Sequence, residues 1–297
     1  MQFDLYCMEC LVRHQAELAA AQGGGEKGYR FLRESMRLLL DAPEGVGAPY
    51  LTAEFNRLYD ETYGGGDYYA EIRAESNRLM LQKLPGIRAR IAAADDPLLM
   101  ALRFAQVGNY IDFGALRDGV QADVLDRLLD GAAELPIDQE EYRRFRDDLS
   151  RAGKLVYLGD NAGEIVADLA LIETVRAAFP DLDVVFAVRG RPVLNDVTRG
   201  DASMVGMDKA ARIVDNGTGI PGTDPARVGP ELRAELETAG VILSKGQGNF
   251  ETLCPSGWNA YYMFLCKCDR FVKMFGVPHL TGMFRSERRM PAIDPYQ

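Results

Sequence analysis

The segment at residues 154–179 constrains the fold more than any other part of the chain. An apolar run at 155–158 stops at the polar sequence Gly-Asp-Asn-Ala-Gly-Glu at 159–164, and apolar residues at helical spacing follow. A short apolar run, a glycine-containing turn and an amphipathic pattern predict a strand, a tight turn and a crossover helix. In open parallel sheets, ligands bind where such turns leave the carboxyl ends of the strands. Asp160 and Asn161 are therefore the first candidates for a functional site.

Alternating strands and helices follow this segment towards the end of the chain. Short apolar runs recur at 183–188, 212–214, 240–244 and 260–265, and residues 282–284 are a candidate edge strand. Polar turns and helical patterns separate these runs, an order that predicts parallel strands joined by right-handed crossovers. We therefore expect residues 151–297 to form an α/β domain, a mainly parallel, Rossmann-like sheet with crossover helices.

Residues 1–150 show helical periodicity and no clear strand, so we expect a helical N-terminal subdomain. Glycine and proline breaks, among them Pro85-Gly86, divide it into short helices. No long linker separates the two halves, and the helical part is expected to be a cap on the sheet rather than a free domain. Residues 108–114 are predicted to be a loop, either a capped turn in which Asn109 and Asp112 bond the backbone or a loop that sends one of them into the site.

Charge and hydropathy limit the classes of function. The formal net charge is −10, which argues against a broad electrostatic attraction to nucleic acid or to anionic membranes. The sequence has no apolar run of about 18 residues, and its first residues lack the basic region of a signal peptide, so we expect a cytoplasmic protein. An anionic substrate must then be held locally, by a metal ion, by Lys or Arg, or by backbone amides.

Metal-ligating residue types are unevenly represented. The only histidines are His14 and His279, which argues against a histidine-rich zinc site and favours oxygen ligands for Mg²⁺ or Mn²⁺. The Cys-Met-Glu-Cys motif at 7–10 has the spacing of half a zinc site, but Cys266 and Cys268 could complete it only if the two ends of the chain meet. We favour buried or partly buried structural thiols, then zinc, then redox chemistry.

Polar residues follow three of the predicted strands. Asp160 and Asn161 follow the first strand, Asp196 lies a short way past the second, and Lys245 follows a later one. Parallel strands bring their carboxyl ends to one edge of a sheet, so these residues can converge. Asp160, Asn161 and Asp196 would offer a hard cation three oxygen ligands. Lys245 and the glycine-rich turn from Gly246 would face a phosphate.

Such a set suits phosphoryl transfer to water. The metal ion and Lys245 would offset the charge of the phosphoryl oxygens, while either a water molecule held by the metal or Asp160 itself attacks. Each residue also has a simple structural alternative, since Asp160, Asn161 and Asp196 could cap helices and Lys245 could be a solvated strand end. The occurrence of all of them at successive strand ends favours the functional interpretation.

Several motifs together give the chain a resemblance to a known family. They are Gly-Asp-Asn-Ala-Gly-Glu at 159–164, Arg-Pro-x-x-Asn-Asp-x-Thr at 191–198, Lys-Gly-Gln-Gly-Asn-x-Glu at 245–251 and Lys-Cys at 267–268, preceded by Cys-x-x-Cys at 7–10 and Gly-Asn-x-Ile-Asp at 108–112. In these motifs, which span nearly the whole chain, it resembles the metal-dependent damage-control phosphatases, formerly a domain-of-unknown-function family.

The resemblance implies a helical N-terminal part on an α/β domain, with a divalent ion held by Asp160, Asn161 and Asp196: Mn²⁺ or Mg²⁺, with Co²⁺ or Ni²⁺ as alternatives. It implies hydrolysis of small phosphorylated metabolites, such as sugar phosphates or phosphopantetheine-like compounds, damaged ones included. Asp160 and Lys245 are then the expected catalytic residues, with Lys245 on the phosphate side. Further substrate contacts are expected from Asn109, Asp112, Gly163, Glu164, Arg189, Asn195, Gly246, Asn249 and Glu251.

Two other functions remain as alternatives. An S-adenosylmethionine-dependent carboxyl methyltransferase usually needs a G-x-G turn after its first strand, which the turn at 159–164 lacks, and an acidic residue after the next strand, where Arg189 stands. A non-catalytic regulator that binds phosphorylated metabolites would need no metal ion beside an attacking water. A haloacid-dehalogenase-type phosphatase would need a second Asp where the chain has Ala162, so that mechanism is rejected.

Overall fold

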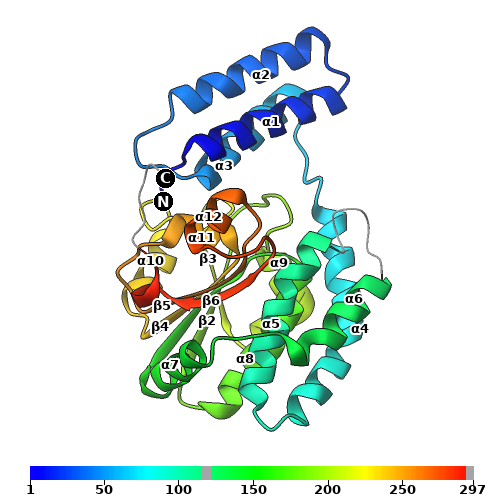
Figure 1. The fold of residues 1–297 in the computed structure, drawn as a ribbon. Coiled ribbons are helices and arrows are strands. Elements are labelled where there is room, and N and C mark those ends of the chain that lie inside the picture. Colours follow the sequence, from blue (N-terminus) through cyan, green and yellow to red (C-terminus); the bar gives the residue numbers. More distant parts are fainter. Residues whose placement is uncertain (115–121, 292–297) are drawn as a thin grey trace.

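A six-stranded sheet lies at the centre of the part of the chain that the structure describes (Figure 1). The computed structural model describes residues 1–114 and 122–291, and only the backbone at 111–114, 122 and 123. The strands are β1 (Lys154–Leu158), β2 (Asp183–Val188), β3 (Arg212–Asp215), β4 (Val241–Lys245), β5 (Ala260–Leu265) and β6 (Gly282–Ser286). Their order is β3-β2-β1-β4-β5-β6, parallel except for β6, which pairs antiparallel with β5. The predicted α/β fold with a mainly parallel sheet is confirmed.

The strand order reverses next to β1. The chain first adds β2 and β3 on one side of β1 and then returns to add β4 and β5 on the other. Such a reversal opens a crevice beyond the carboxyl ends of the strands on either side of it, where α/β proteins bind ligands. Because β1 ends at Leu158 and β4 ends at Lys245, the residues that follow these two positions border the crevice.

Helices cover both faces of the sheet. Along β1, Leu155 and Tyr157 belong to one buried core, and Val156 and Leu158 belong to the other, as the two-residue period of a strand requires. The first core includes residues of α4 (Ala70–Ala92), α5 (Pro97–Gly114), α6 (Ala122–Asp130), α7 (Gln139–Arg151), α8 (Glu164–Ala178) and α9 (Arg199–Val205). The second includes residues of α10 (Pro230–Glu237), α11 (Gln247–Leu253) and α12 (Asp269–Phe275). Short 3-10 helices occur at η1 (Gly131–Glu134), η2 (Met207–Lys209) and η3 (Glu287–Arg289).

The first three helices form a unit with a small core of their own. They are α1 (Leu5–Ala21), α2 (Gly25–Leu40) and α3 (Ala48–Tyr63), and Figure 1 shows them together beyond one end of the sheet. The Asp4 carboxylate lies 3.0 Å from Arg270 Nε on α12, and the amino group of Met1 donates to the Glu251 carbonyl at 2.6 Å. The helical half thus has two parts, because α4–α7 share the core of the sheet and α1–α3 do not.

Two predicted breaks in the helical half are absent. α4 continues through Pro85, since Leu84 and Ile87 on either side are both buried in the same core. The predicted loop at 108–114 is the last part of α5, and a Cβ on Gly108 would lie 3.2 Å from the Cβ of Glu164 on α8. Gly108 therefore allows α5 and α8 to approach closely and does not mark a turn.

Within residues 1–114 and 122–291, no helix combines the length and the apolar content needed to span a bilayer.

Candidate active site

The Asp160 side chain lies in the crevice between the ends of β1 and β4. A Cβ on Gly246, the residue after β4, would lie 1.9 Å from Asp160 Oδ2, so the Gly246 backbone lies directly against the carboxylate. Gly246 has φ 82° and ψ 158°, a conformation that is essentially restricted to glycine. Glycine at this position therefore makes room for the Asp160 carboxylate.

The Asn161 side chain is oriented by two carboxylates. Its amide nitrogen donates to Asp160 Oδ2 and to Glu164 Oε1, both at 2.9 Å. None of the hydrogen bonds from the described residues goes to its Oδ1, and the residue is 6% exposed. An amide whose two donors are both engaged presents its carbonyl oxygen elsewhere, and that oxygen can act as a ligand for a hard cation.

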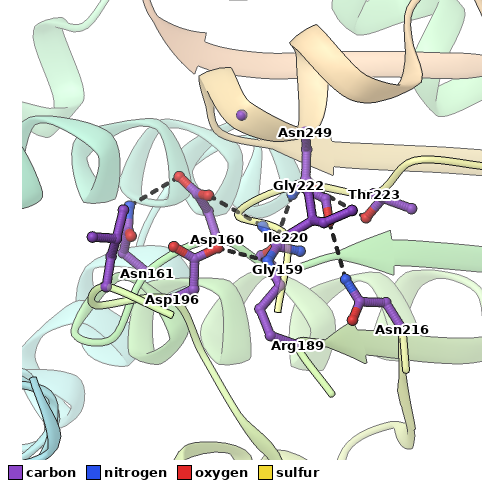
Figure 2. A network of polar contacts seen from close by, with 12 residues as sticks. Gly159, Asp160, Asn161, Arg189, Asp196, Asn216, Ile220, Gly222, Thr223 and Asn249 are labelled. Atoms are coloured by element: carbon purple, nitrogen blue, oxygen red, sulfur yellow. Dashed lines mark hydrogen bonds and ion pairs between the residues drawn. The ribbon is translucent and has the colours of Figure 1, made fainter. Parts of the chain in front are cut away.

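Asp196 is brought to the same place by backbone pairing. Asn161 and Asp196 form an isolated antiparallel bridge, and Val197 N donates to the Asp160 carbonyl at 2.8 Å. Arg189 Nε donates to Asp196 Oδ2 at 2.6 Å, and Arg189 Nη2 lies 3.6 Å from Asp160 Oδ1 (Figure 2). The Arg189 side chain is 1% exposed. One buried guanidinium thus lies beside both carboxylates.

The electrostatic environment of Asp160 disfavours its charge. Burial raises the pKa of Asp160 well above its ordinary value, and the neighbouring Glu164 and Asp196 carboxylates raise it further. Arg189 and Lys267 act in the opposite direction. Desolvation and like charges that oppose ionisation are the conditions that a bound cation relieves. The donor set of two carboxylates and one amide oxygen therefore fits Mg²⁺ or Mn²⁺.

The capping alternative fails for the three predicted ligands. The N-cap of α8 is Gly163, with no side-chain cap bond, so neither Asp160 nor Asn161 caps that helix. The N-cap of α9 is Thr198, which forms a capping box with Asp201. The alternative that Asp196 caps this helix was wrong, because the chain stays paired with residues 160–162 until Val197 and turns only at Thr198.

The Lys245 side chain lies in the buried interior, between β4 and the helices α5 and α8. It is fully buried, and its Nζ donates to the Ala105 carbonyl (2.9 Å), Glu164 Oε2 (3.1 Å) and Asp168 Oδ1 (2.8 Å). Burial alone would lower the pKa of Lys245, but the two carboxylates raise it above its ordinary value. An ammonium group has three donors, and all three are engaged here. In this arrangement no donor of Lys245 is left for the predicted contact with phosphate.

Asn249, predicted to contact substrate, is engaged within the protein. Its amide nitrogen donates to the carbonyls of Gly159 (3.0 Å) and Lys245 (2.7 Å), and its Oδ1 accepts the Thr223 hydroxyl (2.8 Å). Figure 2 shows it between the end of β1 and the loop that carries Thr223. It links the ends of two neighbouring strands, and its polar atoms are used in doing so.

For the other residues predicted to contact substrate, the structure gives fewer contacts. Glu251 accepts a hydrogen bond from Gln247 at 2.9 Å, and Asn195 is half-buried in the loop that carries Asp196. Asn109 is 2% exposed, and its Nδ2 has no hydrogen-bond partner among the described residues. The side chain of Asp112 lies outside the described residues. Contacts between these residues and a substrate stay predictions.

Two site residues were missed at the level of sequence. Asn77 on α4 is fully buried, and its Oδ1 accepts the backbone N–H of Gly163 at 2.7 Å while its Nδ2 donates to Asp201 at 3.0 Å. The positive charge of Lys267 lowers the pKa of Asp160. The sequence could have indicated Lys267, because it lies two residues after the end of β5, just as Asp160 lies two residues after the end of β1.

The five cysteines are free thiols. Cys7 is 3.7 Å from Arg270 Nη1, and burial raises its pKa to about 11 and that of Cys268 to about 12. Thiols with raised pKa are poor nucleophiles and poor metal ligands. Within the described part of the chain, no three His, Cys, Asp or Glu side chains form a metal-binding group. The arrangement favours structural thiols, although Cys10 is exposed and not buried as predicted.

Comparison with known proteins supports this picture of the fold. The model of the damage-control phosphatase ARMT1-like domain matches residues 4–281. A damage-control phosphatase of Archaeoglobus fulgidus is 31% identical, over 93% of this chain and 96% of its own. An uncharacterized protein of Methanocaldococcus jannaschii is 30% identical, over 91% of each chain. The crystal structure of a DUF89 family protein from Pyrococcus horikoshii superposes with a TM-score of 0.80 at 24% identity, covering 97% of this chain and 99% of that one. The chain belongs to the damage-control phosphatase ARMT1-like family.

Proposed function

We propose that the protein is a divalent-metal-dependent phosphatase that hydrolyses small phosphorylated metabolites, damaged ones among them. Membership of a damage-control phosphatase family supports phosphatase activity. The observation that carries the metal requirement is the convergence of Asp160, Asn161 and Asp196 after two different strands. The Asn161 amide donates to two carboxylates, which leaves its carbonyl oxygen for a cation.

The residues of the crevice have distinct roles in this proposal. Asp160, Asn161 and Asp196 would hold Mn²⁺ or Mg²⁺, an ion that polarises phosphoryl oxygens when bound. Arg189 holds the two carboxylates at a fixed separation before the ion binds. Lys267, whose charge lowers the pKa of Asp160, would attract the phosphoryl group.

The methyltransferase alternative receives no support from the geometry. The ribose of S-adenosylmethionine is usually bound by an acidic side chain directly after the second strand. The residue directly after β2 is Arg189, which is buried and pairs with Asp196. A regulator that binds without turnover differs from an enzyme only in the release of phosphate, so the decisive measurement is catalytic.

Hydrolysis of p-nitrophenyl phosphate by the purified protein, with EDTA or with Mn²⁺, Mg²⁺, Co²⁺ or Ni²⁺, tests the proposal. Activity should require a divalent ion and should fall at least 100-fold in Asp160→Ala and in Asp196→Ala. Asp215→Asn is the matched control, because Asp215 also ends a parallel strand but pairs with Arg199. Full activity in EDTA, or in both alanine variants, would reject the metal site. A screen of phosphorylated metabolites under the best ion then addresses the substrate.

A further inference from the structure

A chain of buried polar side chains runs from the interior to the crevice. Tyr157 OH donates to Asp168 Oδ1 at 2.6 Å, and Lys245 Nζ donates to the same oxygen at 2.8 Å. Lys245 also donates to Glu164 Oε2, and the other oxygen of that carboxylate, Oε1, accepts the amide of Asn161. The side chains of Lys245, Glu164 and Asp168 are at most 1% exposed. The two oxygens of Glu164 therefore join a buried cation to a residue of the crevice.

The surroundings of Glu164 fix its position further. The α5 backbone at Gly108 approaches so closely that a Cβ there would lie 3.2 Å from Glu164 Cβ and 3.3 Å from its Cγ. The Ala105 carbonyl on the same helix takes the third donor of Lys245. Packing on one side and the ammonium group on the other leave the carboxylate little freedom to rotate.

Buried ion pairs of this kind contribute little to stability compared with apolar residues of similar size, but they can select one arrangement among several. Here the ion pair would select the orientation of the Asn161 side-chain amide. The amide oxygen and nitrogen are nearly equal in size, so the hydrogen-bond partners decide which of the two faces the crevice. With Glu164 held as an acceptor, the amide nitrogen is turned towards it and the oxygen away from it.

We propose that Lys245 is a positioning residue: it holds Glu164, and Glu164 turns the Asn161 amide so that its oxygen is available to the divalent ion. Lys245 acts through two side chains and does not touch the substrate. This inference rests on the proposed function for its purpose, but the orientation of Asn161 exists in the metal-free protein and can be observed there.

The informative variant is Lys245→Met/Asp168→Asn. It removes the ammonium group while keeping the formal charge of the buried cluster, which limits the loss of stability that a lone Lys245→Met would cause by leaving two unpaired carboxylates. Glu164→Gln tests the next link, because a neutral amide can present its own N–H to Asn161. Lys154→Met is the matched control, since Lys154 begins β1 and pairs with Glu235 at 2.7 Å, at the opposite end of the strand.

Two readouts test the proposal in folded protein. In metal-free protein labelled with ¹⁵N-asparagine, the side-chain NH₂ signals of Asn161, assigned from Asn161→Ala, should shift or broaden in both test variants and stay in place in Lys154→Met. The dissociation constant for Mn²⁺, measured by calorimetry without substrate, should rise 10- to 100-fold in the test variants, as for other residues that orient metal ligands.

The outcomes separate the rival roles. Unchanged Asn161 signals and unchanged Mn²⁺ affinity, with weaker inhibition by inorganic phosphate, would overturn the proposal. That result would instead support a direct contact between Lys245 and phosphate. If the unaltered protein binds no Mn²⁺, the proposed function fails, and the Asn161 signals alone still decide whether Lys245 orients the amide.

Discussion

Gly246→Ala is the sharpest test of where Asp160 must lie. The new methyl group would be built 1.9 Å from Asp160 Oδ2 and 2.1 Å from its Cγ. Because side-chain Cβ atoms in proteins essentially never approach other heavy atoms within 3.0 Å, the carboxylate or the backbone must move by about 1 Å. A displacement of about 1 Å at a reacting centre can cost about 100-fold in rate. We therefore expect kcat/KM for metal-dependent phosphate release to fall about 100-fold.

Backbone strain alone must be separated from this displacement, and Gly64→Ala does so. Gly64 has φ 102° and ψ 133°, close to the Gly246 conformation, and nothing lies within 4 Å of the position of its Cβ. Both substitutions should lower the free energy of unfolding by about 1–3 kcal/mol, measured by urea denaturation, but only Gly246→Ala should lose activity. A folded Gly246→Ala protein with unaltered kcat/KM would refute the placement of Asp160 in the reacting centre.

Three further predictions concern the framework of the fold, two of them at the site and one at the opposite end of the sheet. Arg189→Leu leaves the Asp160 and Asp196 carboxylates without their shared cation, so the free energy of unfolding of the metal-free protein should fall by about 3 kcal/mol; an unchanged urea midpoint would contradict this. Asn77→Ala removes the acceptor of the Gly163 N–H and should cost about 1–3 kcal/mol in the same measurement, with wild-type stability as the contrary result. Arg212 and Lys154 hydrogen-bond Glu235 and, against a smaller effect of burial, lower its pKa from 4.5 to about 2. Its contribution is therefore present above about pH 4.5 and is lost as the pH falls towards 2. Glu235→Gln should cost about 1 kcal/mol at pH 7, and the difference should shrink below pH 4.5; a difference that grows on acidification would contradict the sign.

The sheet was predictable because each parallel strand is a short apolar run that ends in polar residues. β1 and β4 are buried along nearly their whole length, and such strands carry continuous apolar sequence. The convergence of Asp160 and Asp196 followed from the same rule, since the carboxyl ends of parallel strands share an edge. The breaks at Pro85 and Gly108 were mispredicted because tertiary packing decides whether a helix tolerates these residues.

The position of Lys245 was predictable, but the direction of its side chain was not. The last residue of a strand can point into the crevice or into a core, and partners 81 and 77 residues away along the chain decide which. One signal was present nonetheless. Asp168 stands among apolar residues in α8, one turn after Glu164, and acids on an otherwise apolar helix indicate a buried cation that pairs with them.

The balance of buried charge at the crevice bears on what kind of group can occupy it. The side chains concerned are all at most 13% exposed, with four carboxylates and two cations among them: Asp160, Glu164, Asp168 and Asp196 against Arg189 and Lys245. Two carboxylates in excess are costly in a weakly solvated site. A divalent ion would offset that excess, whereas the dianion of a phosphate alone would add to it. Under the proposed function, phosphate would be bound here together with cations: Lys267 would supply part of the positive charge, and a metal ion held by Asp160, Asn161 and Asp196 would supply the rest.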